Sequence, residues 1–224
     1  MKHLSLILII LILSCCPLHP AYAFFDKDIR LLTMRDGLAD NTIPCIYKDE
    51  DGFMWFGTDN GLSRYDGKTI QNFKPANTYV SIAAIVRLSD DFLGIVSDGY
   101  LYYFNRKRET FLPIHTESDT AIGVFNVLPA DDSSFWGISG NRLILCQWEI
   151  QQGKEEEKTA VRVRIQKTFQ LLEEKGEVFS SLCYHEKAGS GIWLTTNRGN
   201  LILFHPDTPG AYQKIPLTDG KTLQ

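Results

Sequence analysis

The sequence predicts an all-β protein made of β-propeller blades, about four four-stranded antiparallel blades after an N-terminal signal peptide. Three observations predict this fold class. Segments with one pattern recur at a period of roughly 40 residues, as in propellers and solenoids. Asp-Gly and Asn-Gly steps separate short apolar runs, which is typical of strands joined by tight turns. Tryptophans stand at matching points of three of the segments.

The chain begins with "MKHLSLILIILILSCCPLHPAYA", which has one lysine, an apolar run, two prolines and Ala21-Tyr22-Ala23. These features predict a secretory signal peptide over residues 1–23, because the apolar run is too short to span a bilayer. The mature region is then residues 24–224, and we expect it in the periplasm. An alternative is processing as a lipoprotein, which would anchor the protein to a membrane through Cys15.

Four segments share the order apolar strand, polar turn, a second strand that contains tryptophan in three of them, Gly or Asn turn and aliphatic strand. With a fourth, outer strand added to each, the predicted blades cover residues 42–73, 81–114, 123–170 and 177–217. Gly94 stands in the second blade where the others have tryptophan.

The stretch "DGFMWFGTDNGLSRYDG" shows why tryptophan recurs between tight turns. Asp-Gly and Asn-Gly steps supply the positive-φ positions of short hairpin turns. Trp55 is then expected to fill the core where neighbouring sheets stack. The predicted structural anchors of the blades are Trp55, Trp136, Trp193, Gly52, Gly57, Gly61 and Gly67.

Residues 29–33 precede the first blade and are predicted to form a strand without a partner of their own. Propeller rings are often closed by an N-terminal strand that completes the last blade, so we expect a ring-closing strand here. Its partner would lie beyond Gln224. Pairing with the outer strand of the fourth blade would instead indicate a closed four-bladed ring.

Composition excludes several classes of function. The chain has 224 residues, 44% of them hydrophobic, and a formal charge of −4. It can therefore bury a core, and it has no basic cluster that would indicate a nucleic-acid partner. Cys45, Cys146 and Cys183 show no disulfide or zinc spacing, and buried thiols are the simpler expectation. The "DEDG" at residues 49–52 lacks the other ligands of an EF-hand, so we expect a turn, and no metal or other cofactor.

Residues 31–73 carry a specific family resemblance. The "DGL" at residues 36–38, "DEDGFMWFGT" at 49–58 and "YDG" at 65–67 closely resemble the first blade of the two-component regulator propeller of periplasmic hybrid two-component sensors of the Bacteroides type. The other three blades match only in outline. This resemblance implies blades of a seven-bladed ring and an extracytoplasmic region that senses glycan fragments to control polysaccharide-utilisation genes. It implies an oligosaccharide ligand, a homodimeric full-length sensor, and membrane attachment only through a downstream span; this chain contains no kinase or output motif.

Ligand-contacting and catalytic residues are not marked by the sequence, and no catalytic residue is predicted. The "YLYYF" strand offers alternating rings, so Tyr100, Tyr102 and Tyr103 are candidates for stacking on a sugar, against the simpler expectation that they fill the core between blades. Two alternatives stay open. One is a secreted propeller enzyme of the sialidase or lyase type, which would need arginines such as Arg30, Arg64 and Arg87 gathered with tyrosine and acids. The other is a non-catalytic scaffold.

Overall fold

The structure is a computed structural model, and it describes residues 29–74, 80–116, 122–151, 160–184, 191–208, 210 and 212–216. The chain divides into two units, Met1–Leu31 and Leu32–Gln224. The predicted signal peptide and Cys15 lie outside the described residues. Of the first unit only residues 29–31 are described, and they form neither helix nor strand. All that follows concerns the second unit.

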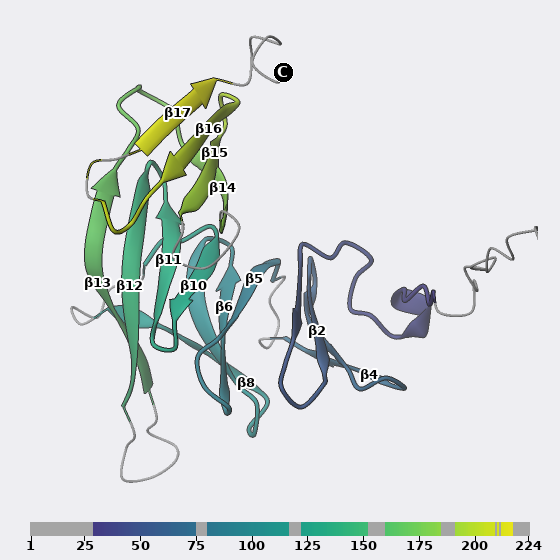
Figure 1. The fold of residues 1–224 in the computed structure, drawn as a ribbon. Helices are drawn as coiled ribbons and strands as arrows, with labels where there is room; N and C mark the ends of the chain where they lie inside the picture. The colour runs from purple at the N-terminus through teal and green to yellow at the C-terminus, as the bar shows by residue number, and fades with distance from the viewer. Residues whose placement is uncertain are drawn as a thin grey trace, which may run out of the picture. The chain divides into compact units, whose positions relative to one another are not determined.

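The described part of the second unit contains four sheets, and in each of them four strands pair antiparallel in sequence order, as expected for propeller blades (Figure 1). The predicted all-β fold class of stacked four-stranded blades is confirmed. Blade one contains β1 (Cys45–Lys48), β2 (Met54–Thr58), β3 (Gly61–Tyr65) and β4 (Ile70–Phe73). Blade two contains β5 (Ile82–Arg87), β6 (Phe92–Ser97), β7 (Tyr100–Asn105) and β8 (Thr110–Pro113). Blade three contains β10 (Val127–Asp131), β11 (Ser134–Ser139), β12 (Arg142–Gln151) and β13 (Ala160–Gln170). Blade four contains β14 (Phe179–Tyr184), β15 (Ile192–Thr196), β16 (Asn200–Phe204) and β17 (Tyr212–Pro216).

Blade three has one strand more than predicted. β9 (His115–Thr116) follows the outer strand of blade two and pairs in parallel with β13, at Arg162 and Val163. The segment from β8 to β9 therefore joins the outer edges of two consecutive blades. A two-residue strand carries no hydrophobic alternation, so the sequence could not indicate it.

Residues 29–33, the predicted ring-closing strand, are not in a strand in this structure. Thr33 instead caps the 3₁₀ helix η2 (Met34–Asp36), where its side chain accepts a hydrogen bond from the Arg35 N–H. Among the described strands, β17 pairs only with β16. The closing strand stays a prediction that concerns a partner outside this chain.

The turn glycines of blade one have the geometry that the motif requires. Gly52, Gly61 and Gly67 have φ of 90°, 111° and 96°. Gly61 is also crowded, because a Cβ there would lie 2.8 Å from the Phe73 carbonyl oxygen. Gly57 has a different role: a Cβ would lie 2.4 Å from Cys45 Sγ and 2.7 Å from Ile82 Cγ2, so a glycine lets β5 of blade two approach blade one.

The described core consists of three hydrophobic clusters, one between each pair of consecutive blades. Each cluster is formed by side chains from two consecutive blades. Such burial is expected where sheets pack face to face, because alternate side chains of a strand point to the same face. No helix among the described residues has the length and apolar composition needed to cross a membrane.

Candidate functional site

Trp55, in β2, is the centre of the interface between blades one and two. Its side chain is fully buried. The ring centroids of Phe73 and Phe104 lie 6.0 Å and 5.6 Å from that of Trp55, and 5.0 Å from each other. Edge and tilted contacts of this kind stabilise aromatic clusters beyond the area that they bury. Trp55 therefore lies in the core between blades one and two.

Asp49, in the turn before β2, binds the same tryptophan. One carboxylate oxygen accepts hydrogen bonds from Trp55 Nε1 at 2.7 Å and from Arg106 Nη2 at 2.9 Å. The other accepts from the Phe53 N–H at 2.8 Å. The Asp49 side chain is only 3% exposed, so these donors replace the water that a buried carboxylate loses. The first aspartate of the motif is therefore a structural residue.

Arg106 comes from the turn between β7 and β8 and links blade two to this network. Besides Asp49, its guanidinium donates to Asp51 at 2.6 Å and to the Asp90 carbonyl oxygen at 2.7 Å. It also lies over the Trp55 ring, 6.0 Å from the centroid. We call Asp49, Asp51, Trp55, Asp90 and Arg106 the Arg106 latch. An arginine that binds two carboxylates across an interface fixes the geometry of that interface, because the guanidinium is planar and always charged.

A crevice of about 420 Å³ lies beside the latch, between blades one and two. Its further lining includes Tyr47, Arg64, Arg87 and Lys107. These cations have partners: Arg87 donates to Asp90 at 2.7 Å, and Lys107 to Asp91 at 2.9 Å. The hydrogen bond to Asp90 raises the pKa of Arg87, and burial raises the pKa of Tyr47. The crevice is thus lined by charges of both signs that neutralise one another.

The structure brings together two of the three arginines considered for an enzyme of the sialidase type. Arg64 and Arg87 both line the crevice. Arg64, however, stacks over Phe53 with its guanidinium carbon 5.0 Å from the ring centroid, and it donates to Gln71 at 2.6 Å. Within the described ranges, no group of three or more His, Cys, Asp or Glu side chains could hold a metal ion.

The three candidate tyrosines lie in different environments along β7. Tyr103 is 3% exposed and packs edge-on against Phe92, with centroids 5.6 Å apart. Burial raises its pKa. Tyr102 is half-buried against the cluster between blades one and two. Tyr100, at the start of the strand, is 49% exposed.

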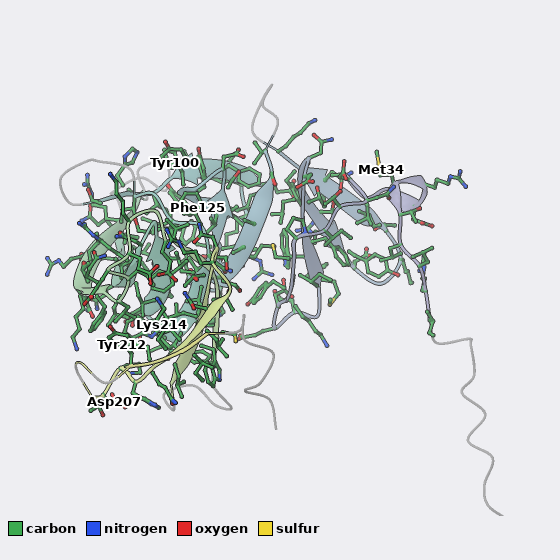
Figure 2. The ribbon with its side chains drawn as sticks, turned by 90° about the horizontal axis from the view of Figure 1, so that it is seen from above. Met34, Tyr100, Phe125, Asp207, Tyr212 and Lys214 are labelled. Carbon is green, nitrogen blue, oxygen red and sulfur yellow. The ribbon has the colours of Figure 1, made fainter. Side chains whose placement is uncertain are left out.

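Phe125 is an exposed ring that the sequence did not single out. It follows β9 and precedes β10, and 61% of it is exposed (Figure 2). Its ring lies against the turn that precedes Tyr100, because a Cβ on Gly99 would be 3.2 Å from Phe125 Cε1. A phenylalanine in "GVFNVL" looks like any strand residue, so no local signal distinguishes it.

The other two predicted tryptophan anchors lie, like Trp55, in the second strand of their blade. Trp136, in β11, is buried and lies 5.9 Å and 6.0 Å from the ring centroids of Phe169 and Phe204. Trp193, in β15, is half-buried.

Glu177, just before β14, is a second buried carboxylate. Burial raises its pKa, but hydrogen bonds from Asn200, Thr196 and Lys214 outweigh this effect and lower it.

Asp49, Asp51 and Trp55 of the latch fall in a part of the chain that matches a known family model, whereas Asp90 and Arg106 lie outside it. Residues 37–60 match the model of the two component regulator propeller, which confirms the predicted resemblance over this segment. No curated protein sequence matches the chain.

Three solved structures show the range of similar propellers. The extracellular domain of BT4673 from B. thetaiotaomicron, assigned to a hybrid two component system, is 16% identical with a TM-score of 0.49, over 77% of this chain and 27% of that one. That of BT3049 from the same organism is 14% identical with a TM-score of 0.49, over 82% and 31%. Virginiamycin B lyase from Staphylococcus aureus is 13% identical with a TM-score of 0.49, over 78% and 55%. This chain therefore spans less than a third of the two B. thetaiotaomicron domains.

Proposed function

We propose that this chain is part of the extracytoplasmic ligand-sensing propeller of a hybrid two-component sensor that responds to oligosaccharides. The observation that carries the proposal is the match of residues 37–60 to the two component regulator propeller. That segment contains β1 and β2, two of the four strands of blade one, and Asp49 and Trp55 are structural there, so the motif supports a recognition scaffold.

The charged groups near the motif support a non-catalytic role. A general acid, a base or a nucleophile needs a side chain that can approach the substrate. In the Arg106 latch, Asp49 is buried and occupied by three donors, and Arg106 bridges two carboxylates. Such groups hold blades together. Arg64 and Arg87 line one crevice with Tyr47, as the sialidase alternative would need, but they are bonded to Gln71 and Asp90.

In this proposal, ligand binding favours one arrangement of two sensor copies over another, and the free-energy difference passes to a kinase in the same sensor. The homodimer, the kinase and output modules and the membrane span all belong to the full-length sensor. Export by the predicted signal peptide places the propeller in the periplasm, where oligosaccharides arrive. The formal charge of −4 argues against a nucleic-acid partner, because nucleic acids are themselves negatively charged.

The test is direct binding by the full chain. Purified protein is titrated with a panel of neutral and acidic oligosaccharides by calorimetry, and each sugar is then recovered and weighed by mass spectrometry. We expect at least one sugar to bind and to be recovered intact. Shortened or unsaturated products would support the enzyme alternative and overturn the proposal, as would a folded chain that binds no sugar in the panel.

A further inference from the structure

The turn between β6 and β7 presents two exposed aromatic rings on a fixed backbone. Asp98 and Gly99 have φ of 49° and 80°, two successive positive values of the kind that tight hairpin turns require. Tyr100 follows directly and is 49% exposed, and Phe125, which contacts Gly99, is 61% exposed. Most other large aromatics of the described blades are buried in the inter-blade clusters or packed against them, so two exposed rings beside one turn need a reason.

The backbone of blade three ties Phe125 to this turn. The Val124 N–H donates to the Gly99 carbonyl at 2.7 Å, and the Phe125 N–H donates to the Ile138 carbonyl at 3.0 Å. Tyr100 also forms an isolated bridge with Gly123. The backbone that carries both rings is therefore held by hydrogen bonds between two consecutive blades, so a ligand would meet them with little loss of backbone conformational entropy.

Carboxylates lie in the turn that precedes Tyr100 and in the corresponding turn of blade one. The Ser97 hydroxyl is 3.3 Å from an Asp98 carboxylate oxygen and donates to the Ser81 carbonyl at 2.9 Å. The Ser81 hydroxyl in turn donates to Asp59 at 2.8 Å, in the corresponding turn of blade one. Each carboxylate has lone pairs left over, which can accept hydrogen bonds from hydroxyl groups.

We propose that Tyr100 and Phe125 form a sugar-stacking surface, with Asp98 and Asp59 as hydroxyl acceptors, and that its ligand is an uncharged pyranose chain. The inference rests on the proposed function and adds the site and the charge of the ligand. The C–H face of a pyranose carries partial positive charge and packs against the negative face of an aromatic ring. The carboxylates of Asp98, in the turn that precedes Tyr100, and of Asp59 repel a uronate or a sulfate and can accept hydrogen bonds from neutral sugars. We call Tyr100, Phe125, Asp98 and Asp59 the Tyr100–Phe125 surface.

The experiment compares variants of the full chain in calorimetric titrations with neutral hexasaccharides of glucose, xylose and mannose and with oligogalacturonate. We expect the wild type to bind a neutral sugar and not the oligogalacturonate. Phe125→Ala and Tyr100→Ala should each weaken binding by roughly tenfold or more, and Phe125→Trp should preserve it. Tyr212→Ala is the matched control, because Tyr212 is 39% exposed in blade four and lies apart from the two rings in Figure 2.

The outcomes separate this inference from the proposed function. If the wild type binds a neutral sugar and both alanine variants bind it equally well, the Tyr100–Phe125 surface is wrong while the sensor proposal stands. A wild type that binds only the oligogalacturonate overturns the charge assignment. A folded wild type that binds no sugar overturns both proposals. Circular dichroism of each variant checks folding. Asp98→Asn tolerates positive φ and keeps an acceptor oxygen, so it tests the charge assignment with the rings intact: oligogalacturonate should bind it more tightly than it binds the wild type, and unchanged binding would overturn the role of the Asp98 charge.

Discussion

The interface between blades one and two and the interface between blades three and four each contain one tryptophan and two phenylalanine rings in contact. Trp55, Phe73 and Phe104 form the first, and Trp136, Phe169 and Phe204 form the other. The distances between the tryptophan and the two phenylalanine centroids are 6.0 and 5.6 Å in one and 5.9 and 6.0 Å in the other. In both, the tryptophan and one phenylalanine come from one blade and the second phenylalanine from the next, so each triad closes across the interface.

The polar groups around the two triads differ. Trp55 donates to Asp49, and Arg106 of the next blade completes the latch. In blade three the turn aspartate, Asp131, is one residue closer to its tryptophan and follows an irregularity in the pairing of β10 with β11. Its carboxylate accepts hydrogen bonds from Ser133 and Ser134. The aromatic triad therefore forms without the latch, which adds orientation to an interface that hydrophobic packing already closes.

The interface between blades two and three shows a third solution. Gly94 replaces the tryptophan, and Cys146 pairs with Phe135 where blade two has Phe104 opposite Leu93. The space is filled by Val86 and Leu88 beside Gly94, and by Trp148, which stacks on Phe135 at 5.7 Å. Aromatic volume has moved along the strand, so the interface stays packed without the triad.

Removing the tryptophans should have the largest effect. We expect Trp136→Ala to lower the free energy of unfolding by about 3–5 kcal/mol, as for large core truncations. Trp55→Ala should cost about 1 kcal/mol more, because Asp49 also loses a buried hydrogen bond. Urea denaturation of the full chain measures both. Equal losses would mean that the latch adds nothing to the triad.

Breaking the latch alone should have the next largest effect. Arg106→Met leaves the Asp49 carboxylate, 3% exposed, without its cation, and we expect a loss of about 2–3 kcal/mol. The estimate is below that for a fully buried pair, because Arg106 is itself 16% exposed.

Lys107→Met is the matched control for the latch. Its pair with Asp91 spans 2.9 Å, but the two side chains are 72% and 44% exposed, so the loss should stay below about 1 kcal/mol. Similar losses for the two variants would show that the contact of Arg106 with Asp49 is no stronger than a surface ion pair.

The sequence predicted the parts of the fold that repeat and the parts that are local. The blade pattern and the turn glycines follow from alternation and from Asp-Gly and Asn-Gly steps, so the fold class and the core role of Trp55 could be inferred. The Arg106 latch could not, because Arg106 and Asp49 lie in turns of different blades. Nor could the site: alternation places Tyr100, Tyr102 and Tyr103 on two faces, but the packing of the next blade decides that Tyr103 is buried and Tyr100 exposed.

Filling Gly94 tests whether the interface between blades two and three has exchanged its tryptophan for tight aliphatic packing. A Cβ at residue 94 would lie 2.7 Å from Val86 Cγ1 and 3.1 Å from Leu88 Cδ2. We expect Gly94→Ala to cost about 1–2 kcal/mol through overpacking. In a Val86→Ala background the same change should cost less, because the nearest atom is gone. An unchanged cost in that background would locate the strain elsewhere.

Thiol modification compares the opening of two interfaces with the smallest perturbation. Cys45 lies at the interface between blades one and two, with its sulfur 3.6 Å from the Ile82 carbonyl. Cys146 is fully buried at the interface between blades two and three. Burial raises the pKa of Cys45 to about 11, against a lowering hydrogen bond with Gly57, and the pKa of Cys146 to about 12. Only the thiolate reacts, so at pH 8 about one Cys45 in a thousand and one Cys146 in ten thousand is reactive.

We therefore expect iodoacetamide, followed peptide by peptide with mass spectrometry, to modify the exposed Cys183 first, then Cys45 and last Cys146. Below these pKa values the rates at Cys45 and Cys146 should rise about tenfold per pH unit, because the thiolate fraction rises with pH. Cys146 reacting faster than Cys45 would contradict the comparison. Since its thiolate fraction is lower, such a rate requires more frequent opening between blades two and three, and packing around Gly94 would then be a weaker closure than the triad with its latch.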